Sequence, residues 1–284
     1  MYRELIRGSQ EVFEGRVKSK LCVVLGQSRS GYYQGQNREK ELAMRREHVI
    51  VEVKEIRKRQ PCVGGRKLKR MLSMRVGRDW LFGVLRGEGL LVRRRRNAVR
   101  TTCSRHPFKR DGNRIREREP SRSGEQWVSD ITYVDLEVGP AYLSLITDRD
   151  ARKIVGHYLS RDLMNTGPIR ALDKALEKHR VSKNWIHHSD QGSQYCSWDY
   201  VRKVEEQRGH MSMTEGAHVH QNALAERVNG ILKEELGLAS RFSSFEEARK
   251  GVEESIEIYN HERLHLALHY KTPGEVHQQN CPLF

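Results

Sequence analysis

The chain has 284 residues, enough for two or three small domains. Its 52 Lys and Arg residues outnumber its 37 Asp and Glu residues, and the net charge of +15 favours a polyanionic partner such as DNA. Five cysteines stand apart at positions 22, 62, 103, 196 and 281, which excludes a zinc ribbon and fits a reducing compartment. With no signal peptide and no run of about 18 apolar residues, we expect no membrane partner.

Residues 1–60 are expected to form an N-terminal helical region. A short helix is predicted within residues 1–17, and a helix, turn and second helix over residues 18–34. A charged helix follows over residues 37–60, where Leu42, Val49, Val53 and Ile56 supply the apolar positions and Pro61 ends the helix.

Residues 61–99 are predicted to be a DNA-binding region resembling a helix-turn-helix. One helix is expected near residues 64–72, a turn over residues 74–77, and a second helix that Asp79 caps. Because the second helix of such a pair enters the major groove, we expect Arg78 and Arg86 to contact DNA. A plain helical pair without DNA contacts is the alternative.

A run of four arginines follows this region. A solvated tail is one explanation for the run, and a phosphate clamp is the one we favour. The DNA-binding residues predicted here are Arg93, Arg94, Arg95 and Arg96. Residues 100–123 are rich in Arg, Pro, Gly and Ser and are predicted to be a mobile basic linker.

Residues 124–284 are expected to form the catalytic domain. Strands are predicted over residues 126–133, 141–147, 153–159, 183–188 and 210–214. Helices are predicted over residues 168–179, 198–207 and 223–236. Three strands followed by alternating helices and strands are typical of an α/β fold with a mixed sheet flanked by helices.

Three carboxylates fall at the ends of these elements. Asp130 lies in the first strand and Asp190 follows the fourth strand, with 59 residues between them, and 35 residues lie between Asp190 and Glu226. Each one taken alone is best explained as a cap or a surface charge. Gathered at one sheet edge, they would repel each other without a cation, and Mg²⁺ prefers oxygen ligands. We therefore expect all three to be catalytic and to hold two Mg²⁺ ions over a DNA phosphate.

Several motifs together resemble a known family. They are W-V-S-D-I-T-Y at 127–133, H-S-D-Q-G-S-Q-Y at 188–195, N-A-L-A-E at 222–226, Tyr259-Asn260 with Arg263 and His265, and Thr272-Pro273. The chain resembles an insertion-sequence transposase of the DDE type, specifically the second-reading-frame product of the IS-three family, which is related to retroviral integrases. The resemblance implies an RNase H-like domain that cuts element ends with water and joins the resulting 3′-hydroxyl to target DNA.

The resemblance also implies cofactors and partners. It implies two Mg²⁺ ions, with Mn²⁺ able to substitute, and double-stranded DNA as element end and target. Pairing of two ends implies a homo-oligomer on DNA, and a protein from an upstream reading frame is a further expected partner. These features suggest action in the bacterial cytoplasm, on the nucleoid.

Three residues near the carboxylates are assigned supporting or DNA-binding roles. His188 matches a family position that orients the site, with a buried structural histidine as the alternative. Asn222 is expected to position Glu226 or to contact DNA, with helix capping as the alternative. Lys233 lies about two turns beyond Glu226 on the same helix and is expected to face the scissile phosphate, unless it is only a surface lysine.

Two rival functions stay open at this point. The residues His261, Glu262 and His265 match H-E-x-x-H, the pattern of zinc metalloproteases, which requires both histidines on one helix. A catalytically inactive DNA-binding remnant of a transposase is the other rival. It is suggested by Gln221, where the family usually has an acidic residue, and by Arg227, where it usually has serine.

Overall fold

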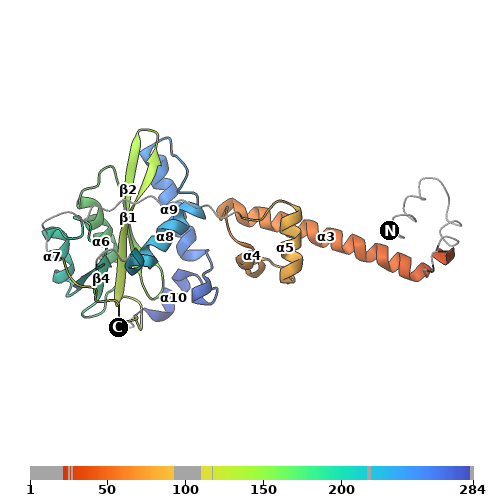
Figure 1. Ribbon diagram of the computed structural model, residues 1–284, viewed down its shortest axis with the longest axis horizontal. Coiled ribbons are helices and arrows are strands. Elements are labelled where there is room, and N and C mark those ends of the chain that lie inside the picture. Colours follow the sequence, from red (N-terminus) through yellow and green to blue (C-terminus); the bar gives the residue numbers. More distant parts are fainter. Residues whose placement is uncertain are drawn as a thin grey trace. The chain divides into compact units, whose positions relative to one another are not determined.

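The computed structural model describes residues 22–24, 26, 28–92, 110–116, 118–215 and 219–281. The described residues form two compact units (Figure 1). One unit contains residues up to 55 together with residues 71–90, and the other contains residues 56–70 together with those from 91 onward. The domain boundaries predicted after residues 60, 99 and 123 stay predictions.

The first unit is built on the long helix α3 (Arg29–Arg59), of which residues 56–59 belong to the second unit. The break expected between residues 34 and 37 was wrong, because the helix runs through it without interruption. The side-chain amide of Gln36 donates to the Tyr32 hydroxyl at 2.8 Å and spans this stretch. The glycines at 31 and 35 each cost a helix only about 1 kcal/mol, and no proline interrupts it.

Helix α5 (Arg78–Gly87) packs against α3 within this unit. Leu81, Val84 and Leu85 are its buried residues. The Arg45 guanidinium lies 5.4 Å from the Trp80 ring centroid. The N-cap of α5 is Gly77, so the expected cap at Asp79 was wrong, and Asp79 lies in the first turn instead.

The second unit contains α4 (Gly65–Met71), apart from its last residue, and a five-stranded sheet. The strands are β1 (Gln126–Leu136), β2 (Gly139–Asp148), β3 (Ile154–Ser160), β4 (Ile186–Ser189) and β5 (His210–Met213). Their order is β3-β2-β1-β4-β5, with β1, β2 and β3 antiparallel and β4 parallel to both β1 and β5. All five predicted strands are present, and the predicted mixed sheet is confirmed.

Helices cover both faces of this sheet (Figure 1). One face packs against α6 (Thr166–Lys178) and α7 (Trp198–Glu206), with Trp127, Trp185 and Tyr200 in its core. The other face packs against α8 (Ala223–Glu234) and α9 (Phe245–His261), with Val134 and Leu232 in its core. The predicted α/β class, a mixed sheet flanked by helices behind a helical N-terminal region, is confirmed.

Two helices were not predicted, although the sequence carries their signals. In α9 the Ser244 side chain caps the N-terminus by accepting from the Glu247 backbone N–H. In α10 (Pro273–Asn280) Thr272 and Glu275 form a capping box, and a proline occupies the first turn. Short 3₁₀ helices η2 (Val219–Asn222) and η3 (Leu266–Leu268) precede α8 and α10. Among the described residues, no helix combines the length and apolar character needed to span a membrane.

Candidate active site

The sheet register brings two of the predicted carboxylates to the same level. In the parallel pair of β1 and β4, Val128 lies opposite His188. Asp130 comes two residues after Val128, and Asp190 comes two residues after His188. Because β4 ends at Ser189 while β1 continues to Leu136, the two aspartates lie where β1 loses its neighbour on that side. The turn after β4 fixes Asp190, whose Oδ1 accepts from the Gly192 backbone N–H at 3.0 Å.

Helix α8 is fastened to β1 by two asparagine side chains. The Asn222 amide donates to the Ser129 carbonyl at 2.9 Å. Further along α8, the Asn229 amide donates to Asp130 Oδ2 at 2.8 Å. Asn222 is also the residue before the helix, but its side chain makes no capping hydrogen bond, so the contact to β1 and not the cap is its observed role.

Glu226 and Lys233 share the face of α8 that carries these asparagines. Positions 222, 226, 229 and 233 recur at intervals of three and four residues, which places them in one row along a helix. The Lys233 ammonium lies 3.9 Å from the centre of the Tyr133 ring on β1. Burial lowers the pKa of Lys233, while the nearby Asp130 carboxylate acts in the opposite direction. Lys233 is therefore partly buried against Tyr133 and within electrostatic reach of Asp130.

The pKa of Asp130 shows the influence of both other acids. Burial raises it most, to about 7, followed by the negative charge of Asp190 and, more weakly, that of Glu226. The hydrogen bonds from Asn229 and from the Ile131 backbone N–H act against this rise. The Asp130 carboxylate thus lies within electrostatic reach of both other acids, although Glu226 is exposed.

This donor set suits a hard divalent cation. Within the described ranges, no group of three or more His, Cys, Asp or Glu side chains is spaced to hold a metal ion. Mg²⁺ keeps several of its waters and needs only one or two carboxylates, which Asp130 and Asp190 supply. A bound cation would also relieve the repulsion that raises the pKa of Asp130.

Replacing Asp130 by Asn is expected to stabilise the metal-free protein at high pH. The pKa of Asp130 is about 7 in the folded chain and near 3.9 in an unfolded one. Ionising the buried Asp130 carboxyl therefore lowers the free energy of unfolding. This loss is absent below about pH 4, grows between pH 4 and pH 7, and reaches its full size above pH 7. In EDTA, Asp130→Asn should raise the melting temperature at pH 8 by at least about 2–4 °C, and the gain should vanish toward pH 4.

The exposed Asp135 on the same strand provides the matched control. Asp135→Asn should leave the melting temperature within about a degree at every pH, because a surface substitution changes stability little. Equal melting temperatures of wild type and Asp130→Asn at pH 8 would contradict the electrostatic description of the site.

The two neighbouring histidines are structural in their contacts. His188 is fully buried, and its Nδ1 shares a hydrogen bond of 2.8 Å with the Ser212 hydroxyl on β5. Burial lowers its pKa to about 4, so its ring is neutral. His187 Nε2 is hydrogen-bonded by the hydroxyls of Ser129 and Tyr200, as expected for a buried histidine. The orienting role predicted for His188 stays a prediction.

None of the predicted DNA-binding arginines is among the described residues of the second unit. Arg78 and Arg86 lie on α5 in the first unit, where Arg78 pairs with Asp79 at 2.9 Å. The run at residues 93–96 lies outside the described residues. DNA binding by these six arginines stays a prediction.

The zinc-protease reading of H-E-x-x-H was wrong. Helix α9 ends at His261, Glu262 is its C-cap, and His265 lies beyond the helix. Glu262 is paired with Arg59 at 2.5 Å, and His265 Nε2 is hydrogen-bonded to Arg263 at 2.8 Å. Two histidines on one helix face, which that chemistry requires, are therefore absent from this segment.

The residues that depart from the family pattern have structural partners. The Gln221 side chain accepts from the backbone N–H of Glu215, on the other side of the loop before α8. Arg227 forms an ion pair of 3.3 Å with Glu235 at the end of α8. Both departures are thus accommodated by local contacts, and the inactive remnant stays an alternative that an activity measurement tests.

Sequence reasoning missed Asn229, which makes the direct contact between α8 and Asp130. The signal was its position three residues after Glu226, on the same helix face. It also missed the cavity of about 520 Å³ beside the carboxylates, whose walls include Asp130 and Asp190.

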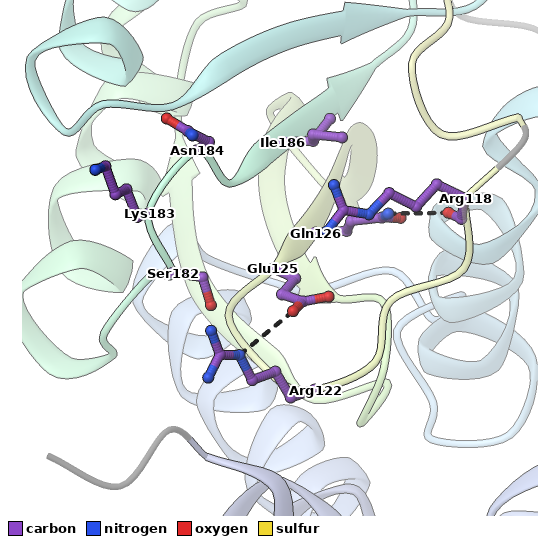
Figure 2. A pocket seen from close by; sticks show the side chains of 8 residues that line it. All are labelled: Arg118, Arg122, Glu125, Gln126, Ser182, Lys183, Asn184 and Ile186. Atoms are coloured by element: carbon purple, nitrogen blue, oxygen red, sulfur yellow. Dashed lines mark hydrogen bonds and ion pairs between the residues drawn. The ribbon is translucent and has the colours of Figure 1, made fainter.

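A second cavity, of about 110 Å³, lies at the opposite ends of the same strands (Figure 2). Gln126 and Ile186, at the starts of β1 and β4, line it together with Arg118 and Arg122. In Figure 2 the Arg122 side chain turns toward Glu125, with which it forms an ion pair of 3.3 Å. This cavity contains none of the predicted catalytic residues, so the larger cavity marks the candidate site.

Comparisons with known proteins identify the family. Two family models, both described as an integrase core domain, match residues 120–218 and 207–273. The insertion element IS600 uncharacterized 31 kDa protein of Shigella sonnei is 34% identical over 89% of this chain and 96% of its own length. The transposase for insertion sequence element IS629, also of Shigella sonnei, is 32% identical over 75% of this chain and 72% of its own length.

Solved structures of retroviral proteins are similar at a lower level. The HTLV-2 integrase catalytic core domain in complex with magnesium matches with a TM-score of 0.46 and 15% identity, over 56% of this chain and 99% of that one. A chain of the simian T-cell lymphotropic virus intasome matches with a TM-score of 0.49 and 17% identity, over 76% of this chain and 70% of that one. The sequence relatives and the matched core domain show that this chain belongs to the insertion-sequence transposases that carry an integrase core domain.

Proposed function

We propose that this chain cuts DNA at the ends of an insertion sequence and joins the cut end to target DNA, with Asp130, Asp190 and Glu226 as its catalytic carboxylates. The observation that carries the proposal is geometric: the register of β1 and β4 brings Asp130 and Asp190 to one cavity, and Asn229, three residues after Glu226 on α8, is hydrogen-bonded to Asp130. The charges of Asp190 and Glu226 both contribute to the raised pKa of Asp130, in agreement with this geometry. Two buried or partly buried acids on one cavity, with a third acid in electrostatic reach of Asp130, support a site for divalent cations rather than a set of unrelated surface charges.

The three acids would hold two Mg²⁺ ions, or Mn²⁺ in their place. When bound, such ions neutralise charge on the attacking and leaving oxygens of a phosphodiester. Asn229 and the Gly192 backbone N–H keep the carboxylates of Asp130 and Asp190 in fixed orientations. Glu226, in the first turn of α8, would supply the third carboxylate.

The proposed reaction has two steps, and in each an oxygen nucleophile attacks a phosphodiester. Water first attacks the phosphodiester at the element end, and the bond to the 3′ oxygen breaks to release a 3′-hydroxyl. That hydroxyl then attacks a phosphodiester of the target, displacing another 3′ oxygen. Both nucleophiles are oxygens that the protein does not supply, so no covalent protein–DNA intermediate is formed.

Lys233 is proposed to contact the DNA phosphate next to the scissile bond. Lys233→Ala should weaken binding to an end-containing duplex by roughly three- to tenfold and lower the slope of log affinity against log salt by about 1. Lys250→Ala, which removes an exposed lysine from α9, is the matched control and should change neither quantity at the specific end. An unchanged salt slope in Lys233→Ala would rule out the phosphate contact.

Pairing of two ends requires at least two copies of the chain on DNA. A homo-oligomer is therefore proposed, together with a partner protein from an upstream reading frame. Light scattering of the chain with and without an end-containing duplex would measure the number of copies, and a complex with one copy per two ends would contradict this part of the proposal.

Metal-dependent nicking tests the proposed function directly. The full chain is incubated with a labelled duplex that carries the termini of its own element, with Mg²⁺, with Mn²⁺ or with EDTA. Nicks at the element end, seen with either metal and lost in EDTA, are expected. Specific binding to the ends without any nick would instead favour the inactive DNA-binding remnant.

A further inference from the structure

We propose that the cavity beside Asp130 and Asp190 receives one unstacked nucleobase of the bound DNA, from a nucleotide flanking the scissile phosphate. This inference builds on the proposed function, because it requires that DNA reach the two aspartates. It adds a base-binding site to a surface that would otherwise contact only the sugar-phosphate backbone.

An aromatic pair forms the floor of the cavity. In the register of β1 and β2, Tyr133 lies directly opposite Tyr142, so the two side chains project from the same face of the sheet. Ile131, two residues before Tyr133, shares that face and packs against the core on the side of α6 and α7. All three residues line the cavity and are only partly buried.

Two segments form the walls. The turn after β4 contributes Gln194, and the loop before α6 contributes Leu163. The Gln194 amide donates to the Leu163 carbonyl at 2.9 Å and joins the two segments across the cavity. Asp130 and Asp190 belong to the same lining, so an occupant would lie next to the candidate cation site.

The chemistry of the lining suits a base better than a phosphate. The lining residues, all of them in the described part of the chain, include no Lys or Arg that could neutralise a phosphate. Tyrosine rings stack on any nucleobase, and the side chains of Thr132 and Gln194 offer hydrogen-bonding groups for a base edge. The cavity volume of about 520 Å³ is within the range of sites that bind small organic ligands.

A cation on α8, Lys233, contacts this lining. Lys233 contacts the ring of Tyr133 and is close enough to Asp130 for the carboxylate to influence its pKa. A phosphate contacting Lys233 and the candidate cations would place its own nucleotide at the cavity. Stacking of that base on Tyr142 would offset the cost of removing it from the duplex.

A double-mutant cycle between protein and DNA tests the proposal. Binding of the full chain to an end-containing duplex is measured by anisotropy in Ca²⁺, with an intact base or an abasic nucleotide at each position flanking the scissile phosphate. Tyr142→Ala should weaken binding of the intact duplex about tenfold, and at one flanking position the abasic duplex should bind wild type and variant equally.

Three controls separate stacking from other effects. Tyr142→Phe keeps the ring and should bind like wild type. An abasic nucleotide about ten base pairs away should leave the tenfold difference intact. The melting temperatures of Tyr142→Ala and Gln194→Ala show whether each variant is folded, and Gln194→Ala should show the same abasic coupling because it removes another part of the lining.

The outcomes also separate this inference from the proposed function. Equal losses on intact and abasic duplexes, or no loss in Tyr142→Ala and Gln194→Ala, would overturn the base site even if wild type nicks DNA in Mg²⁺. Coupling at a flanking position without any nicking in Mg²⁺ would support the base site and overturn the catalytic proposal.

Discussion

Asp190→Asn is expected to reduce strand cleavage and strand transfer by at least about a thousandfold. The substitution keeps the shape of the side chain but removes the charge that pairs with a cation. Cation-based stabilisation of a phosphoryl transition state amounts to several kcal/mol, and each 1.36 kcal/mol corresponds to a factor of ten in rate. The measurement is the rate of nicking and joining of an end-containing duplex, resolved on a denaturing gel in Mg²⁺.

The control for this substitution is Asp199→Asn, which neutralises an exposed aspartate in the first turn of α7. It should cleave at the wild-type rate. Binding of Asp190→Asn to the same duplex in EDTA should equal or exceed that of wild type, since one negative charge near the phosphate is removed. Cleavage by Asp190→Asn within tenfold of wild type would remove Asp190 from the proposed catalytic set.

Glu235→Ala is expected to lower the free energy of unfolding by roughly 3–5 kcal/mol. The Glu235 carboxylate lies 2.8 Å from Arg263 and 3.0 Å from Lys67, and the Arg263 side chain is only 4% exposed. Burial lowers the pKa of Lys67 to about 8 and also lowers that of Arg263, and the charge of Glu235 acts against both changes. Removing the carboxylate leaves two buried cations facing each other without a counter-charge.

Glu234→Ala is the matched control, because Glu234 is the preceding residue on α8 and is exposed. Its effect should stay within about 0.5 kcal/mol. Since the chain has two units, unfolding is best followed by a probe in the second unit alone. Trp127 and Trp185 are buried there, so denaturant unfolding by fluorescence in a Trp80→Phe, Trp198→Phe background isolates it. A loss below 1 kcal/mol for Glu235→Ala would show that the network contributes little.

Local sequence pattern was sufficient for most of the second unit. Alternating and helical spacing of apolar residues predicted all five strands and the helices α6, α7 and α8, because these periods follow from how side chains project from a strand or helix. The start of β4 was predicted three residues early, since Asn184 has a left-handed backbone at φ 59° that a strand does not tolerate. The motifs around the three acids could also be identified from the sequence, because a motif is defined by residue types and their spacing along the chain.

Local pattern was insufficient where distant contacts or chain ends decide the conformation. The sequence predicted separate helices before residue 34 and after residue 37, whereas α3 is continuous there. The H-E-x-x-H motif required a helix through His265, whereas α9 ends at His261. A five-residue motif does not specify whether a helix continues, since packing of the flanking chain decides this.

By itself, the sequence determined the five strands and most helices of the second unit, their order along the chain, the excess of positive charge and the positions of the three acids. Only the tertiary structure decided that Asn229 holds Asp130 across 99 residues, that β4 stops where the aspartates meet, and that Tyr133 lies beside Tyr142. The physical reason is that periodicity reports which face of an element is buried but not what covers it. Register and long-range contacts emerge only when the elements pack together.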